Sequence, residues 1–352
     1  MKRRNAGFTL VEMLVVIAIF GIVLAGTSEM FISLLRTHRQ QSRITETNIE
    51  GIIGLELLRQ DLEKAGYGLP WDMGGVTFNE AAGNPNLLND APSNPPRGIV
   101  NANNVGLNNS DYLVIKASDV ATNKACVKWA FLLETTLLTS VWPTASENLN
   151  PTDQVIIISP APLGNARALI ASGVPFSSAN TYATSAETRV VYGIDTGPIR
   201  MPFNRADYFV DQPSASDMPK RCAPGTGILY KAVVNHADGG FSYLPLLDCV
   251  ADMQVIFRWT NNSGALSTIN VYEDISALPG AFAIRSQVNE VRVFILAHEG
   301  QRDPAYQHPV STVDLGDNGI VKHFDLTTTG IGWQNYRWKV YTLVVRLNNL
   351  NW

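Results

Sequence analysis

The stretch MKRRNAGFTLVEMLVVIAIFGIVLAGTS, residues 1–28, decides the fold of this chain. Its basic first segment ends at Gly7, and between Phe8 and Ser28 the only charged residue is Glu12. As a helix, the 21 residues from Phe8 to Ser28 would be about 31 Å long, close to the roughly 30 Å of a bilayer's hydrocarbon core. The sequence therefore predicts a membrane-spanning helix over residues 8–28.

The basic residues before this helix predict its orientation. Lys2, Arg3 and Arg4 are the charged side chains of the first seven residues. Positively charged flanks of membrane helices stay in the cytoplasm. Residues 1–7 are therefore expected on the cytoplasmic side, and everything after the helix is expected outside the cytoplasm.

Two simpler interpretations explain less of this segment. A secretory signal peptide has a shorter apolar region followed by a small-residue cleavage site, for which Ala25-Gly26-Thr27 is a weak match. A plain signal anchor explains the apolar run but not Glu12. An acidic residue costs about 2.5–3.5 kcal/mol at the centre of a membrane helix, and less near its end. We therefore expect this carboxylate to have a role of its own.

The residues from Gly7 to Glu12, Gly-Phe-Thr-Leu-Val-Glu, resemble the cleavage and methylation site of type IV prepilins. The resemblance implies that a prepilin peptidase cuts after Gly7, which makes residues 1–7 a leader, and that the new terminal amine of Phe8 is methylated. It also implies that Glu12 pairs with the terminal ammonium of Phe8 in a neighbouring subunit and sets the axial register of a filament. Such a partner charge makes a carboxylate tolerable in lipid.

The helix is expected to continue through residues 29–66, first as a polar neck and then against a globular head. This segment contains no proline, and four apolar side chains recur at helical spacing: Leu55, Leu58, Leu62 and Ala65. Gly51 and Gly54 weaken a helix and mark either a flexible point or a close contact. Gly66 is expected to cap the helix, and Pro70 prevents its continuation.

The remaining residues, 67–352, predict a β-rich head. Residues 71–110 are rich in Asn, Pro and Gly and are expected to form a long loop. Later apolar or β-branched runs are predicted as strands: 112–117, 127–133, 154–159, 188–194, 227–234, 253–260, 267–272, 290–297 and 338–347. Asn261-Asn262-Ser263-Gly264 predicts a hairpin between two of them. Residues 160–225 are expected to be an elaboration between two portions of sheet, and whether the head is one unit or two stays open.

Parts of the chain resemble the minor pilin PilW family. These are the helix end with Asp61-Leu62 and Ala65-Gly66-Tyr67-Gly68, the region 222–255 with Met253-Gln254-Val255, and the C-terminal run 336–349. The resemblance implies an α+β fold in which a long N-terminal helix packs on a largely antiparallel β-sheet. Many type IV pilins have a helix-kinking proline shortly after the membrane run. This chain has Glu29 and no proline there, which argues against a bulk filament subunit.

Composition and motifs exclude several function classes. Apolar residues make up 45% of the chain and charged residues 16%, which excludes a generally disordered protein. The formal net charge of -4 shows no basic excess, so we expect no nucleic-acid partner. No HExxH, GxSxG or P-loop motif occurs, so we expect no enzyme, no cofactor and no metal site. Asp314-Leu-Gly-Asp-Asn-Gly predicts a plain turn rather than a calcium loop, and His298 is expected at the surface or in a turn.

The three cysteines, Cys126, Cys222 and Cys249, allow one disulfide in an exported protein. The favoured pair is Cys222 with Cys249, which flank the predicted strand 227–234 and its turn and would close a loop of about 27 residues. Either pairing with Cys126, or three free thiols, remain as alternatives.

Together these features lead to the hypothesis of a minor pilin, similar to PilW, that primes or caps type IV pilus assembly. It would be stored in the bacterial inner membrane and later reach the pilus at the cell surface. Its expected partners are prepilin peptidase, other minor pilins, the major pilin, inner-membrane lipid and the pilus assembly platform. The first alternative is a minor pseudopilin of type II secretion. The second is a pilus-tip adhesin or DNA receptor that uses residues 71–110.

Overall fold

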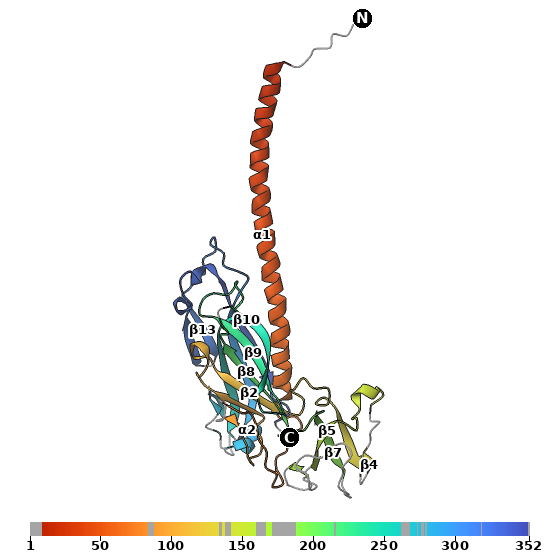
Figure 1. Cartoon of the computed structure of the whole chain (residues 1–352). Coiled ribbons are helices and arrows are strands. Elements are labelled where there is room, and N and C mark those ends of the chain that lie inside the picture. The colour runs from red at the N-terminus through yellow and green to blue at the C-terminus, as the bar shows by residue number, and fades with distance from the viewer. Residues whose placement is uncertain are drawn as a thin grey trace.

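The computed structural model describes residues 9–83, 88–133, 136–137, 142–159, 167–170, 188–214, 216–261, 268–272, 274–275, 278, 280–317 and 319–350. In these residues a long helix is followed by a head of largely antiparallel sheets (Figure 1). The predicted α+β class is confirmed.

Helix α1, Leu10–Lys64, is one continuous element of 55 residues, about 82 Å long at 1.5 Å per residue. Its N-terminal half protrudes from the molecule, and its C-terminal part lies along the head (Figure 1). Ala65 is the C-cap, and Gly66 follows at φ +85°, a left-handed conformation that glycine adopts without strain. The helix therefore ends at the glycine that the sequence indicated.

The predicted apolar stripe joins the helix to the head. Leu58, Leu62 and Ala65 are fully buried in a core cluster shared with the main sheet. The helix passes so close to a strand at Gly54 that an added Cβ would lie 2.1 Å from the carbonyl oxygen of Leu246. Of the two roles left open for this glycine, the structure shows the close contact.

The main sheet has eight strands in the order β1-β2-β8-β9-β10-β12-β15, with β11 paired to β10. The strands are β1 (Ile99–Ala102), β2 (Tyr112–Ala117), β8 (Asn204–Asp211), β9 (Gly227–Val234), β10 (Phe241–Asn261), β11 (Thr268–Tyr272), β12 (Val288–Glu299) and β15 (Arg337–Arg346). All of these pairs are antiparallel. Strand β10 pairs with β9 along its first part, then with β12, and its end pairs with β11, which confirms the hairpin predicted there. Residues 262–264 of its turn lie outside the described residues.

A second sheet of five strands lies in the chain between β2 and β8, in the order β4-β3-β7-β5-β6. Its strands are β3 (Trp129–Leu133), β4 (Thr136–Leu137), β5 (Gln154–Ser159), β6 (Ala168–Leu169) and β7 (Arg189–Asp195). Strands β2 and β8 nevertheless pair with each other, Ala117 opposite Asn204. The second sheet is therefore an insertion that leaves and rejoins the main sheet at neighbouring points. It begins well before residue 160, where the sequence had suggested an elaboration.

Smaller elements complete the head. Strands β13 (Thr312–Asp317) and β14 (Ile320–Asp325) form a hairpin. Of the segment predicted as a plain turn, Asp314 to Asp317 instead lie in β13 and Gly319 lies in the turn, while Asn318 is outside the described residues. Helix α2 spans Gly280–Gln287 at the end of the head far from the protruding helix (Figure 1). Short 3₁₀ helices among the described residues are η2 (Leu107–Asn109), η3 (Ala145–Glu147), η5 (Leu326–Thr329) and η6 (Trp333–Asn335).

Two sequence predictions were wrong in this region. Residues 71–110 are not loop throughout, because β1 lies within them and pairs with β2. Strand β8 was missed because its first residues include Asn204, Arg205 and Asp207, which interrupt the apolar alternation. All three polar side chains are nevertheless buried.

Candidate functional site

Helix α1 begins with a capping box formed by Thr9 and Glu12. The Thr9 hydroxyl accepts a hydrogen bond from the backbone N–H of Glu12 at 3.3 Å. In return Glu12 Oε2 accepts bonds from the Thr9 backbone N–H and the Thr9 hydroxyl, both at 2.9 Å. The carboxylate thus lies at the N-terminal end of the helix dipole, where a negative charge is stabilised. Gly7 and Phe8 lie outside the described residues, so their cleavage and methylation, and the pairing of Glu12 with a neighbouring ammonium, stay predictions.

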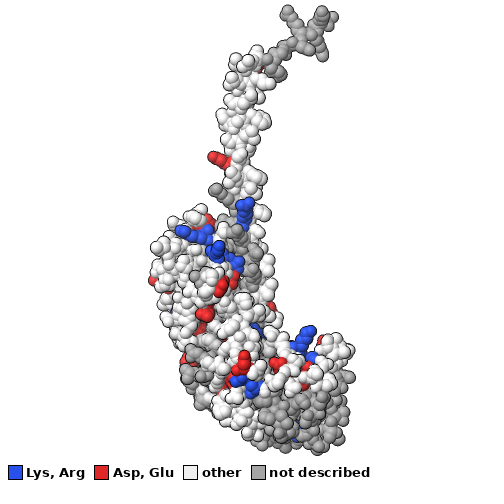
Figure 2. All heavy atoms as spheres, viewed as in Figure 1, with Lys and Arg blue, Asp and Glu red and all other residues white. Residues whose placement is uncertain are grey.

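Beyond the cap, the helix exposes large apolar side chains for more than six turns. They are Leu10, Val11, Met13, Leu14, Val15, Val16, Ile17, Ile19, Phe20, Ile22, Val23, Leu24, Met30, Phe31, Ile32, Leu34 and Leu35. Figure 2 shows this protruding half with very few charged side chains. By length and composition, Leu10–Arg39 is long and apolar enough to cross a membrane. Apolar surface in water costs about 25 cal/mol per Å², so this segment requires lipid or other subunits around it.

Comparison with known proteins supports this interpretation of the N-terminus. Residues 2–28 match the family described as the prokaryotic N-terminal methylation motif. No curated protein and no solved structure matches the chain. The N-terminus is therefore prepilin-like, as in type IV pilins and pseudopilins, and its apolar helix is consistent with membrane anchoring. The match ends at residue 28 and does not extend to the head.

A buried ion pair fixes the helix to the sheet below it. Lys231 of β9 reaches Asp61 of α1, with Nζ 2.5 Å from Oδ2, and both side chains are less than a tenth exposed. The Tyr208 hydroxyl of β8 donates a 2.5 Å hydrogen bond to the same oxygen. Burial, together with the Asp61 carboxylate, raises the pKa of Tyr208 well above its usual range, so the hydroxyl stays a donor. One carboxylate of the helix is therefore held by two strands.

A second buried ion cluster fixes the irregular segment after the helix to the other face of the sheet. Lys116 of β2 lies 2.9 Å from Glu80 and 2.6 Å from Asp90. Arg205 of β8 lies 2.9 Å from Glu80 and 2.7 Å from Asp207. Buried charges persist only when they are paired, so these contacts define where the segment must lie. These charge pairs thus help to hold in place the part of the Asn- and Pro-rich segment that precedes β1.

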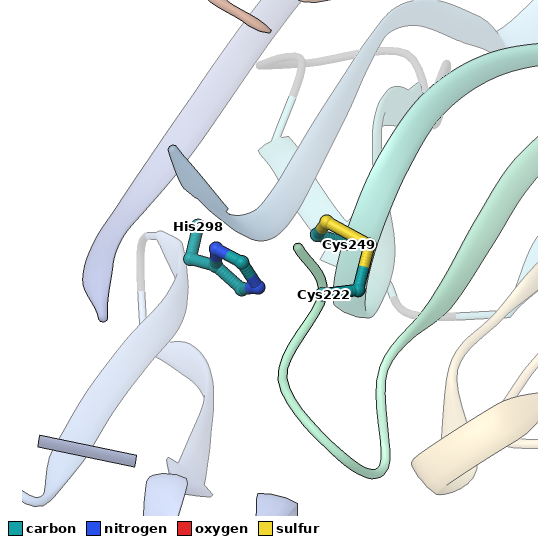
Figure 3. A group of neighbouring side chains, drawn as sticks. All are labelled: Cys222, Cys249 and His298. Atoms are coloured by element: carbon teal, nitrogen blue, oxygen red, sulfur yellow. A yellow bond between two sulfur atoms is a disulfide. The ribbon is translucent and has the colours of Figure 1, made fainter. Parts of the chain in front are cut away.

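Cys222 and Cys249 are joined by a disulfide, and His298 lies beside it (Figure 3). Cys126 is a buried free cysteine. The three side chains in Figure 3 have donor atoms within 4.8 Å of one another, a spacing compatible with a metal ion. Both sulfurs are committed to the disulfide, however, and His298 Nε2 accepts a 2.8 Å hydrogen bond from the Ala223 backbone N–H. With the cysteines oxidised, the disulfide and the His298 hydrogen bond therefore join the segment around Cys222 and Ala223 to strands β10 and β12.

The predicted surface or turn position for His298 was wrong. The residue is 4% exposed, and its ring packs against Tyr336 and Trp338. Burial lowers the pKa of His298 to about 3, and the Arg221 charge acts in the same direction. A neutral ring fits its role as acceptor for Ala223. The sequence His298-Glu299 gave no sign of this, because the aromatic neighbours come from the distant strand β15 and the turn before it.

A cavity of about 420 Å³ opens where the two larger sheets meet. His236 lines it and uses both ring nitrogens. Nδ1 accepts from the Arg200 backbone N–H at 3.3 Å, and Nε2 donates to Asn204 Oδ1 at 3.0 Å. Burial lowers the pKa of His236 to about 4, so the ring is neutral at neutral pH. This histidine holds the junction of the sheets and is not available there as a general base.

The residues predicted to form sites lie far apart. Glu12 is in the first turn of α1, whereas Cys249 lies in β10 of the main sheet and is bonded to Cys222. The sequence analysis missed the ion pair of Asp61 with Lys231, although each residue gave a signal. Asp61 lies within the apolar stripe of the helix, and Lys231 is the only charge in the run 227–234. A charge at such a buried position requires a buried partner.

Proposed function

We propose that this chain is a minor pilin, similar to PilW, that primes or caps type IV pilus assembly after prepilin peptidase cuts between Gly7 and Phe8. The observation that carries the proposal is the methylation motif at residues 2–28, continuous with a helix whose apolar half is exposed. A helix of this kind is stable in lipid while the subunit is stored and in a bundle of like helices once it is assembled.

The head favours a minor over a bulk subunit. Three sheets follow the helix, and the five-stranded one extends to the side of the main sheet (Figure 1). A head of this size is hard to repeat along a narrow filament, whereas at a tip few neighbours compete for space. The ion pair of Asp61 with Lys231 gives a firm connection between helix and head, as a subunit pulled out of a membrane by its helix requires.

The first test counts surface pili by electron microscopy in a deletion strain, with and without the retraction motor. Loss of pili that is reversed when the motor is also removed would mean that the protein promotes initiation against retraction. Loss in both backgrounds would make it an obligatory primer. Normal pili in both would refute the proposal, and a loss of protein secretion in that strain would identify a type II pseudopilin instead.

The second test separates assembly from cleavage by changing Glu12. We expect Glu12→Ala to be cleaved and inserted normally but to be absent from filaments, because its carboxylate is proposed to receive a neighbour's terminal ammonium. Glu29→Ala is the matched control, since Glu29 is the other carboxylate in the protruding half of the helix. Immunoblots of sheared pili and of membranes measure the two pools. Normal incorporation of Glu12→Ala would refute the assigned role.

A further inference from the structure

One end of the head faces the protruding half of α1 (Figure 1). Residues 300–311 and 326–336 form this end, here called the membrane-facing cap. It begins where β12 ends, and a Cβ added to Gly300 would lie 3.0 Å from Ile44 of the helix. Ile44 is nine residues beyond Leu35, where the exposed apolar run ends, or about 14 Å along the helix axis. The cap is therefore the part of the head next to the candidate membrane span.

The cap presents one apolar side chain to solvent almost completely. Ile331 is 99% exposed. It lies between Gly330 at φ +102° and Gly332 at φ +89°, two left-handed positions that other residues adopt only with strain. This pair of glycines makes a sharp turn between η5 and η6 that places Ile331 at its tip. Single exposed apolar residues are common on soluble proteins, so its location must give it meaning.

A second exposed apolar residue, Val310, lies on the other segment of the cap. It is 50% exposed. The two segments are tied by backbone hydrogen bonds, from His308 N to Gln334 O at 2.7 Å and from Leu326 N to Ser311 O at 2.8 Å. Ile331 and Val310 therefore belong to one rigid surface and not to separate loops.

The cap has a cation, Arg302, beside the turn that carries Ile331. Its charged residues are Arg302 and Asp303, and Asp303 pairs with Arg337 at 2.9 Å. Arg302 stands beside the turn, with a guanidinium nitrogen 3.0 Å from the Cβ position of Gly332. An aliphatic side chain gains by entering the headgroup layer, and a cation beside it is attracted to anionic lipid by about 1 kcal/mol.

We propose that this cap rests on the outer surface of the membrane that α1 enters, with Ile331 in the headgroup layer and Arg302 beside lipid phosphates. The inference rests on the membrane anchoring in the proposed function but not on a role in priming. The helix between span and head is continuous and free of proline, so the cap is held at a short, fixed distance from the lipid. Because the helix tethers the cap to the membrane, the effective concentration of lipid at the cap is high, and even a weak affinity for lipid keeps the contact formed.

The contact would give the stored subunit a defined orientation. With the cap on the membrane, the head leans over the lipid and the helix is held upright. Extraction into a filament then has to separate Ile331 and Arg302 from the lipid as well as the apolar helix. The proposed docking would therefore hold the subunit in the membrane until the assembly machinery pulls on it.

The test places an environment-sensitive dye on Ile331→Cys in the full-length protein, reconstituted into anionic nanodiscs. The substitution leaves the fold intact because the side chain touches little of the protein. Labelling is selective, since burial raises the pKa of the Cys126 thiol to about 11. The matched control is Phe282→Cys on α2, an apolar position 70% exposed at the opposite end of the head.

We expect the emission of the dye at position 331 to be blue-shifted and to be quenched by lipids spin-labelled near the headgroup. The dye at position 282 should not be quenched. Adding Arg302→Gln should lower the ratio of quenched to unquenched probe roughly five-fold in anionic nanodiscs. If the protein co-purifies with nanodiscs but the dye at Ile331 is as solvent-exposed as at Phe282, the cap inference is wrong and anchoring stands. If the protein does not co-purify with nanodiscs, both the inference and the proposed function fail.

Discussion

The ion pair between helix and sheet allows a quantitative prediction. Changing Asp61→Ala leaves the Lys231 ammonium, 7% exposed, without its carboxylate and removes the acceptor of the Tyr208 hydroxyl. Removing one partner of a buried pair costs about 3–5 kcal/mol. An unsatisfied buried hydroxyl costs about 1–3 kcal/mol, part of which relaxation recovers. We therefore expect the variant to lose about 4 kcal/mol of unfolding free energy, a large part of the roughly 5–15 kcal/mol typical of folded proteins.

The matched variants separate charge burial from loss of contact. Asp61→Leu combined with Lys231→Met removes both charges and keeps similar volume, so the unpartnered Tyr208 hydroxyl is the main remaining cost and we expect this variant to lose only about 1–3 kcal/mol. Glu56→Ala removes a carboxylate of the same helix whose partner Arg59 is exposed, and its unfolding midpoint should hardly move.

Urea unfolding of the full-length protein in detergent micelles, followed by tryptophan fluorescence, measures these differences. Trp259 and Trp338 are buried in the main sheet and report its unfolding. With a denaturant slope of about 3 kcal/mol per M, the Asp61→Ala midpoint should fall by roughly 1 M. A shift no larger than that of Glu56→Ala, or a double variant as unstable as Asp61→Ala, would refute the buried pair as the link between helix and head.

Three further predictions concern the head. Gly54→Ala should destabilise the head although alanine favours helix, because the new Cβ would lie 2.1 Å from the carbonyl oxygen of Leu246. Gly26→Ala is the control: a Cβ there has no atom within 4 Å, so this variant should keep the stability of the parent. Peptide mass mapping should find Cys222 bonded to Cys249 and Cys126 free; Cys126 in a disulfide would contradict the structure. Replacing both bonded cysteines by alanine should lower the free energy of unfolding by about 3–4 kcal/mol. Burial holds the pKa of His298 at about 3, below its value of 6.5 in the unfolded chain. As pH falls, the unfolded state therefore binds a proton before the folded state does, and the free energy of unfolding decreases between about pH 6.5 and pH 3. This group contributes a slope of at most about 1.4 kcal/mol of unfolding free energy per pH unit. His298→Gln should make the pH dependence of stability shallower, whereas His323→Gln, at an exposed position, should leave it unchanged.

The sequence predicted those elements whose pattern is local. The helix end at Gly66 and the strands β2, β5 and β9 depend on apolar periodicity and breakers that lie within a few residues. Strand β8 could not be found this way, because Arg205 is a charged side chain whose burial depends on a partner more than a hundred residues away, Glu80.

The same division holds for the candidate site. Gly7, Phe8 and Glu12 belong to a short motif of neighbouring residues, so the sequence alone indicates it. The contacts that join helix to head, such as Asp61 with Lys231, exist only after the chain folds. Their signal was a charge inside an apolar pattern, which indicates that a partner exists but not which residue it is.

The insertion of the second sheet has a consequence for the order of folding. Strands β2 and β8 pair at Ala117 and Asn204, so 86 residues must be looped out before the main sheet can close. Closing a flexible loop of that length costs about 4 kcal/mol of chain entropy beyond a constant term. If the second sheet forms first, its own strands bring the two ends of the loop together and remove most of this cost. We therefore expect the inserted sheet to fold early and to hold the ends of β2 and β8 close together while the larger sheet forms.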